Sequence, residues 1–258
     1  MAVANEYQGK PVCFIAVNSG NNTKEVSSYL KSHKVSWPTI VDTKREVEKA
    51  IIKGQISTSN IWQFRTIDGE GNLKRAGGDL KAEIDKALST ASWNVDPASI
   101  PDSLQQAWQS VEFGDFPAAA KMVNAAMKSK DEEIKTGAKV LNDFVQSELA
   151  EPLASAAALK EDEEKAWDAY KAYSMLEKQF KGYLDDSVNT KKILRELKST
   201  DQVKLELSAM RQLETASNDA ARFGFKKAMG RLKKIISKYP DTEAAATAEK
   251  LLSENGAE

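Results

Sequence analysis

Residues 10–42 read KPVCFIAVNSGNNTKEVSSYLKSHKVSWPTIVD, and this stretch decides the fold that we expect for the first part of the chain. Val12 to Val17 is a continuous run of apolar, strand-forming residues, which is typical of a strand buried on both faces. Residues 19–23 then break the strand and offer side chains that cap a helix. Strand-forming residues return at Thr39 to Val41. The order strand–helix–strand predicts a parallel βαβ unit, the core of an open α/β sheet.

A β-hairpin is expected further along the same half. Residues 61–68, IWQFRTID, alternate in character, residues 69–72 form a turn cluster, and residues 73–76 return as a short strand. Asp79 is then placed to cap a helix. The apolar positions of that helix are Leu80, Ile84, Ala87 and Leu88. Shorter helical segments are expected at residues 1–9 and 45–53.

The second half reads as helix throughout. Residues 92–101 contain two prolines and no periodicity, so they are expected to be a linker between an α/β domain (1–91) and an α-helical domain (102–258). Pro152 lies inside a long helical pattern and predicts a kink or a split there. The expected helices are 102–113, 116–129, 131–160, 162–182, 187–198, 200–218, 223–238 and 241–253.

Composition excludes several kinds of site and partner. The net charge of −1 argues against a dedicated nucleic-acid binder, and no apolar run approaches the roughly 20 residues of a membrane span. One cysteine and one histidine allow no intramolecular disulfide, no two-cysteine metal site and no multi-histidine site. We therefore expect no catalytic constellation, no cofactor and no metal. The N-terminus lacks a signal-peptide pattern, so a cytoplasmic location is the default expectation.

Two places in the helical half resemble tetratricopeptide repeats. In residues 107–127, AWQSVEFGDFPAAAKMVNAAM, Trp108 lies in the first expected helix and residues 114–116 at the turn. Ala119, Val123 and Ala126 match the second helix. In residues 237–252, SKYPDTEAAATAEKLL, Tyr239-Pro240 ends one helix before Asp241 or Thr242 caps the next. Because the period between these places is irregular, we expect an irregular array of helical hairpins.

Residues 10–88 resemble the redoxin branch of the thioredoxin fold. The matching pieces are PVCFIAVNSG, KEVSSYLKSH, WPTIVD, TIDGEGNLKRAGG and DLKAEIDKAL, in the order of that fold. The resemblance implies that the first strand and helix of the fold, with their Cys-x-x-Cys motif, are missing, and so is the cis-proline loop that faces the motif. The lone Cys13 falls in a strand, where we expect it to be a buried hydrophobe. The domain is thus expected to be an incomplete, redox-inactive thioredoxin-like sheet.

The missing strand of the resembled fold would leave two unpaired apolar edges. Either the chain is a piece of a longer protein, or the two edges close on each other, or another chain supplies a strand and an oligomer forms through the edges. We expect the first to explain the origin of the sequence. For a structure of this chain alone, we expect the edges to close.

A protein-binding groove is the only candidate site. At the face where the resembled fold has its active site, Trp37-Pro38 and Trp62 are candidate groove residues, and Ser59 and Asn60 are candidates for hydrogen-bonding a partner's backbone. The competing interpretation is core packing for the aromatic side chains and a plain polar loop for the others. We expect a non-enzymatic scaffold or adaptor with a protein partner. The alternative is the C-terminal portion of an exported thiol-disulfide oxidoreductase.

Overall fold

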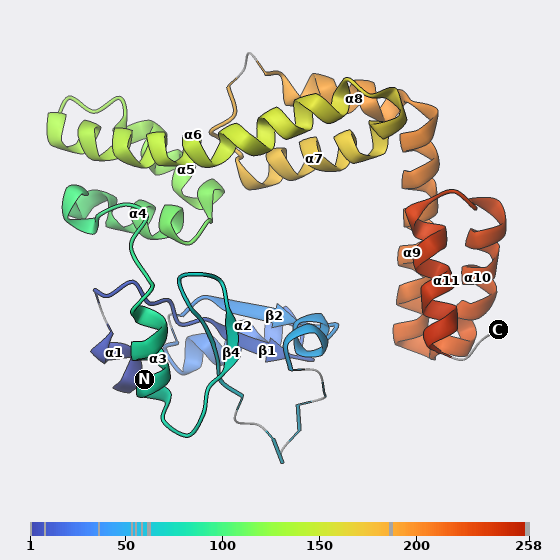
Figure 1. The fold of residues 1–258 in the computed structure, drawn as a ribbon, viewed down its shortest axis with the longest axis horizontal. Coiled ribbons are helices and arrows are strands. Elements are labelled where there is room, and N and C mark those ends of the chain that lie inside the picture. Colours follow the sequence, from blue (N-terminus) through green and yellow to red (C-terminus); the bar gives the residue numbers. More distant parts are fainter. Residues whose placement is uncertain are drawn as a thin grey trace. The chain divides into compact units, whose positions relative to one another are not determined.

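The computed structural model describes residues 2–7, 9–35, 37–52, 54, 56–57, 59–60, 63–185 and 188–255 (Figure 1). The chain divides into two compact units, Met1–Asn94 (unit 1) and Val95–Glu258 (unit 2). Every described strand belongs to unit 1, and unit 2 is helical. The fold class is therefore a small mixed α/β unit followed by an all-α unit, as the sequence predicts at this coarse level.

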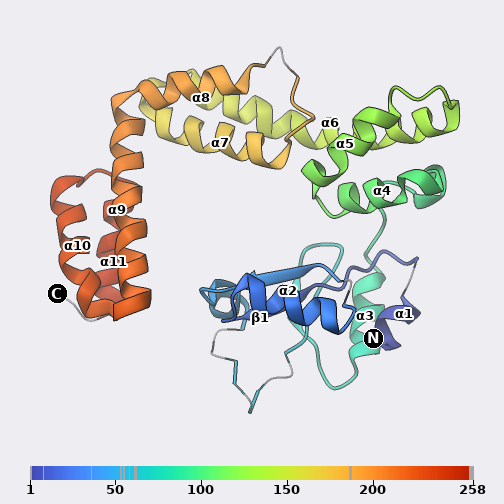
Figure 2. The ribbon, with the colours of Figure 1, turned by 180° about the vertical axis from the view of Figure 1, so that it is seen from behind.

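The βαβ unit at the start of the chain is present. Strands β1 (Ala16–Ser19) and β2 (Thr39–Asp42) pair in parallel, with Val17 opposite Ile40. Helix α2 (Thr23–Ser32) connects them and runs across one side of β1 (Figure 2). Its N-terminus is capped as predicted, because the Asn22 side chain accepts a hydrogen bond from the Glu25 N–H at 3.0 Å. The predicted helix at 45–53 is a single π-helical turn, Glu48–Ile52.

The hairpin and its closing helix complete unit 1. Strands β3 (Arg65–Ile67) and β4 (Leu73–Arg75) pair antiparallel, and helix α3 (Leu80–Leu88) follows with Asp79 as its cap. Helix α1 (Ala2–Glu6) lies beside α3 (Figures 1 and 2). Tyr7 fixes this arrangement, because its buried hydroxyl donates a hydrogen bond to Asp85 at 2.9 Å.

The structure contradicts two predictions for these strands. β1 begins only at Ala16, and the predicted strand Val12–Val17 is not buried on both faces, since Ile15 and Val17 are exposed. Over the described residues, the two strand pairs also do not close on each other, because β1–β2 and β3–β4 are separate two-stranded sheets. With only three or four residues per strand, a joined sheet would gain few hydrogen bonds for the entropy lost in ordering the connecting segment.

The predicted order of helices in unit 2 is confirmed. One-turn 3₁₀ segments precede α4 and α7, at Asp102–Leu104 and Glu163–Lys165. The α-helices are α4 (Gln105–Glu112), α5 (Phe116–Ala126), α6 (Glu132–Lys160), α7 (Ala166–Gln179), α8 (Thr190–Ser199), α9 (Asp201–Phe223), α10 (Phe225–Lys238) and α11 (Glu243–Glu254).

Pro152 does not split α6, which is continuous from Glu132 to Lys160. The residue lies on the exposed side of the helix. Water can therefore satisfy the carbonyl group that the missing proline N–H leaves without a partner.

The first helical hairpin, α4–α5, turns at Gly114. Its φ of 75° lies in the left-handed region, which glycine adopts without strain. The predicted linker also belongs partly to this hairpin, since Val95 and Ile100 are buried. Trp108 holds the segment by donating its indole N–H to the Val95 carbonyl oxygen at 2.8 Å. The structure thus moves the start of the helical unit from residue 102 to residue 95.

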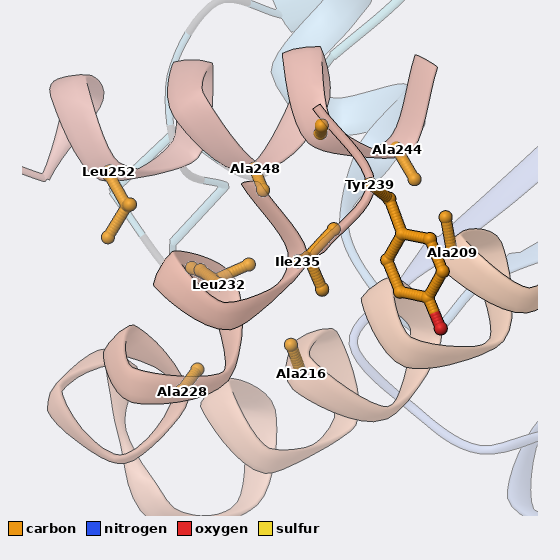
Figure 3. Packing of buried hydrophobic residues seen from close by; sticks show 10 residues of the cluster. Ala209, Ala216, Ala228, Leu232, Ile235, Tyr239, Ala244, Ala248 and Leu252 are labelled. Carbon is orange, nitrogen blue, oxygen red and sulfur yellow. The ribbon is translucent and has the colours of Figure 1, made fainter. Parts of the chain in front are cut away.

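The last three helices share a core made mainly of alanine and branched aliphatic side chains (Figure 3). Small side chains allow the helix backbones to approach closely, as the alanine-rich sequence of α11 suggests. Thr242 is the cap of α11, accepting a hydrogen bond from the Ala245 N–H at 3.1 Å. Leu232, Ile235 and Tyr239 of the α10 segment fill the space between α9 and α11 (Figure 3).

Two helical glycines form a matched pair for testing this packing. A Cβ atom at Gly137 in α6 would lie 2.5 Å from Cδ of Pro101, whereas one at Gly230 in α10 meets nothing within 4 Å. We expect Gly137→Ala to destabilise unit 2 by about 1–3 kcal/mol through overpacking. Gly230→Ala should stabilise it by about 0.5–1 kcal/mol through helix propensity. Urea unfolding followed by far-UV circular dichroism measures both, and shifts of the same sign would contradict the packing.

Candidate interaction surface

The parallel pair β1–β2 presents an open apolar face. Ile15, Val17 and Ile40 are 56%, 45% and 43% exposed, and Val17 lies directly opposite Ile40. Side chains at positions 15 and 17 leave the same face of an extended strand. On the other side, Phe14 packs against Trp37 with ring centroids 5.8 Å apart. One face of the pair is thus covered and the other is an apolar surface open to solvent.

The hairpin repeats this arrangement. Ile67 and Leu73 are cross-strand partners and are 65% and 45% exposed. A hydrogen bond from the Gly69 N–H to the Thr90 hydroxyl, at 3.1 Å, ties the turn to the end of α3. The face that carries Ile67 and Leu73 therefore stays open while the turn is fixed.

Trp37 and Pro38 lie at the entry to β2. The Pro38 carbonyl oxygen accepts a hydrogen bond from the Ala16 N–H at 2.9 Å, and the Trp37 ring packs on Phe14. These contacts give both residues a structural role at the start of the ladder. Their predicted role in partner binding stays a prediction.

The polar loop begins at the opposite end of the strand pair. The Ile56 N–H, next to Ser57, donates to Glu48 at 2.6 Å, beyond the end of β2. Within the loop, Asn60 accepts a hydrogen bond from the Ser57 N–H at 2.6 Å, and the Ser57 and Ser59 hydroxyls lie 2.8 Å apart. The loop that carries Ser59 and Asn60 thus begins at the other end of the strand pair from Trp37 and Pro38. Trp62 lies outside the described residues.

A buried carboxylate cluster that the sequence did not suggest closes the end of β1–β2. Asp42 accepts hydrogen bonds from the Glu46 and Glu48 N–H groups at 2.7 and 3.1 Å. Burial acts to raise the pKa of Glu48, but the hydrogen bond from the Ile56 N–H and the charge of Arg45 outweigh it and lower the pKa. Glu48 is therefore a satisfied anion that organises the π-turn. The available signal was Asp42, an acidic residue directly after the predicted strand Thr39–Val41.

Cys13 has the environment of a structural thiol. It is partly buried, and burial raises its pKa, which lowers the thiolate fraction at neutral pH. In the part of the chain that the structure describes, no three residues among His, Cys, Asp and Glu gather as a metal site. Among the described helices, none is both long and apolar enough to cross a membrane.

Unit 2 also contains a buried carboxylate, Glu206 of α9. Its Oε1 accepts a hydrogen bond from the Glu243 N–H at 3.1 Å at the start of α11, while Oε2 is buried with no hydrogen-bond partner. Burial raises the pKa of Glu206, aided by the charges of Glu243 and Asp168 and opposed by that N–H and by Lys171. The Glu206 carboxylate therefore accepts a hydrogen bond from the first turn of α11, but its burial makes the ionised form unfavourable.

Glu206→Gln should therefore stabilise unit 2 at neutral pH. A carboxyl group whose folded pKa is raised contributes stability below its unfolded pKa, and that contribution is lost as pH rises through the folded pKa. The neutral amide keeps an oxygen for the Glu243 N–H, so the gain in Tm over the parent should grow between about pH 4 and pH 7. Glu214→Gln, an exposed carboxylate on α9, is the control and should show no such growth.

Comparison with protein-family models, curated proteins and solved structures gives no match for this chain. The class of protein is defined here by the fold alone, an α/β unit with open strand faces joined to an all-helical unit. The likeness to redoxins and tetratricopeptide repeats stays a prediction from sequence, and function is argued from the surfaces described above.

Proposed function

We propose that this chain is a non-enzymatic protein-interaction scaffold. In the proposal, unit 1 binds an extended segment of a partner protein through its open strands, and unit 2 presents helix-lined grooves to another protein. The observation that carries the proposal is the exposure of Ile15, Val17 and Ile40 on a sheet that, in the described part of the chain, has only two strands. An open edge strand with exposed apolar side chains favours aggregation, and pairing with a strand of a partner protein satisfies its free backbone groups.

The proposal includes a specific origin for unit 1, an incomplete and redox-inactive thioredoxin-like domain. Support comes from the element order β1, α2, β2, β3, β4, α3, with a parallel first pair and an antiparallel hairpin. Support for redox inactivity comes from Cys13, the only sulfhydryl of the chain, whose pKa is raised by burial. A tetratricopeptide-like origin of unit 2 is supported by the α4–α5 turn at Gly114.

A site-specific photo-crosslinking experiment tests the scaffold role. A benzoylphenylalanine placed at Val17 or Ile40 of the full chain should crosslink one and the same protein in an extract of the source cells. The same probe at Lys24, exposed on α2, is the matched control and should not. The purified captured protein should then bind the unmodified chain, lose affinity for Val17→Asp and bind Cys13→Ser normally. Crosslinks only to a second copy of the chain would replace the adaptor role with self-association.

The second candidate is part of an exported thiol-disulfide oxidoreductase whose Cys-x-x-Cys lies upstream. The same open edge of β1 favours it, because an added central strand from the same polypeptide would pair there. The test is the genomic sequence upstream of Met1. An in-frame apolar strand followed by Cys-x-x-Cys supports this candidate, and an in-frame stop codon excludes it. Insulin reduction by the present chain should be absent in either case.

A further inference from the structure

The open face of the hairpin carries two arginines directly opposite each other. Arg65 and Arg75 are cross-strand partners, so their side chains leave the same face. The neighbouring Ala76 N–H donates to the Phe64 carbonyl oxygen at 3.1 Å. The hydrogen-bonded and non-hydrogen-bonded pairs of an antiparallel ladder alternate, which makes Arg65–Arg75 the closer, non-hydrogen-bonded kind. The two cationic side chains therefore start from closely spaced Cα atoms.

This arrangement costs stability unless an anion compensates it, because like charges directly opposite in a sheet repel. In the described part of the chain, neither guanidinium forms an ion pair, and Arg65 donates to the adjacent Phe64 carbonyl oxygen at 2.9 Å. Lys74, next to Arg75 in sequence and on the other face of the hairpin, is paired with Asp68 at 3.3 Å. The hairpin thus compensates its lysine internally and leaves its two arginines available for an external anion.

Apolar side chains adjoin the arginine pair on the same face. Ile67 and Leu73 form the next same-face level, two residues along each strand and about 7 Å away. Where β4 leads into α3, Arg75 also lines an open pocket of about 580 Å³. The other lining residues are Phe64, Ala76, Gly77, Gly78 and Leu80. Charge and apolar surface therefore alternate over a short distance.

We propose that this hairpin face, defined as Arg65, Ile67, Leu73 and Arg75, binds an acidic–apolar peptide segment of a partner protein. A carboxylate of the segment accepts hydrogen bonds from both guanidinium groups, which suit carboxylates geometrically. An apolar side chain two residues along an extended segment then covers Ile67 and Leu73. The proposal rests on the scaffold role proposed above and names the chemistry of its partner.

The test is fluorescence anisotropy of the full chain with the labelled peptide Ser-Glu-Ser-Ile-Ser, which places Glu and Ile on one face. We expect Arg65→Gln and Arg75→Gln each to weaken binding about tenfold, because charge-assisted hydrogen bonds are the stronger kind. Ile67→Ser should also weaken it. Lys24→Gln, which removes one charge from α2, should leave peptide binding unchanged. The arginine variants should keep the α-helical circular dichroism signal of the parent. The peptide with Gln for Glu should bind more weakly to the parent.

Other outcomes overturn the inference. Peptide binding that is absent, or unchanged in both arginine variants, contradicts it. The inference is also contradicted if anionic phospholipid vesicles or inorganic phosphate bind through the two arginines while the Glu-to-Gln change in the peptide has no effect on peptide binding. If any of these contradicting results is found while crosslinking from positions 17 and 40 still captures a partner, the hairpin inference is wrong and the proposed scaffold role is retained. If crosslinking also fails, both are wrong.

Discussion

Leu232→Ala is expected to lower the free energy of unfolding of the helical unit by about 3 kcal/mol. The Leu232 side chain is 1% exposed and lies within the core shared by α9, α10 and α11 (Figure 3). Many of its neighbours are alanines, which have no side-chain torsion to adjust into the space left behind. The cavity should therefore persist, which places the cost within the range measured for buried leucines. Urea unfolding followed by far-UV circular dichroism measures it.

Leu205→Ala is the matched control, because it removes the same atoms from a side chain that is 43% exposed on α9. Its cost should be about 1 kcal/mol or less, since little apolar surface returns to water and no enclosed cavity forms. Equal losses for the two variants would mean that the three-helix core does not hold the end of the chain together. A small loss for Leu232→Ala alone would mean that the helices close over the space.

The ends of helices were predictable in both units because their determinants are local. Three of the helix caps are side chains that bond to a backbone N–H three residues later: Asn22, Asp79 and Thr242. Contacts of this range can be predicted from sequence alone. Gly114 marks a turn by its backbone freedom, again a local property. Tyr239-Pro240 ends α10 for the same kind of reason. Local rules therefore place the ends of elements even where no repeat is regular.

The burial of the first strand was predicted wrongly because burial depends on adjacent strands and packing layers, which the sequence of the strand itself does not specify. The run Val12–Val17 has the composition of a central strand, yet its burial requires layers on both faces and strands on both edges. Among the strands that the structure describes, β1 has one neighbour, β2, and Ile15 and Val17 stay exposed. The same composition would be buried in a larger sheet.

The candidate site was only partly visible for a related reason. Trp37-Pro38 lies before the start of β2, whereas the loop with Ser57, Ser59 and Asn60 begins beyond its end, an arrangement that depends on the pairing of β1 with β2. The face of the hairpin that carries Arg65 could be predicted from the sequence. The alternation in residues 61–68 that puts Phe64 and Thr66 on one face puts Arg65 and Ile67 on the other. What was missing was the register that sets Arg75 opposite Arg65.

Trp108→Ala is expected to cost about 4 kcal/mol and to release the segment from Val95 to Pro101. Trp108 is a buried side chain of α4 whose indole N–H donates to the Val95 carbonyl oxygen at 2.8 Å. Truncation removes the ring from the α4–α5 hairpin and leaves that carbonyl without its donor, so the packing and hydrogen-bond losses add at one place. Calorimetry or urea unfolding gives the loss, and amide hydrogen exchange reports whether residues 95–101 lose protection.

A graded pair of variants separates the two losses. Trp108→Phe keeps an aromatic ring and removes the donor, so it should cost about 1–3 kcal/mol and expose the segment before the helices. Phe113→Ala removes an exposed aromatic side chain from the end of the same hairpin and should cost about 1 kcal/mol or less. If Trp108→Phe leaves residues 95–101 fully protected, the indole hydrogen bond does not anchor them. The burial of Val95 and Ile100, together with the hydrogen bonds that Gln105 donates to the Pro97 and Ile100 carbonyl oxygens, would then be what holds the segment.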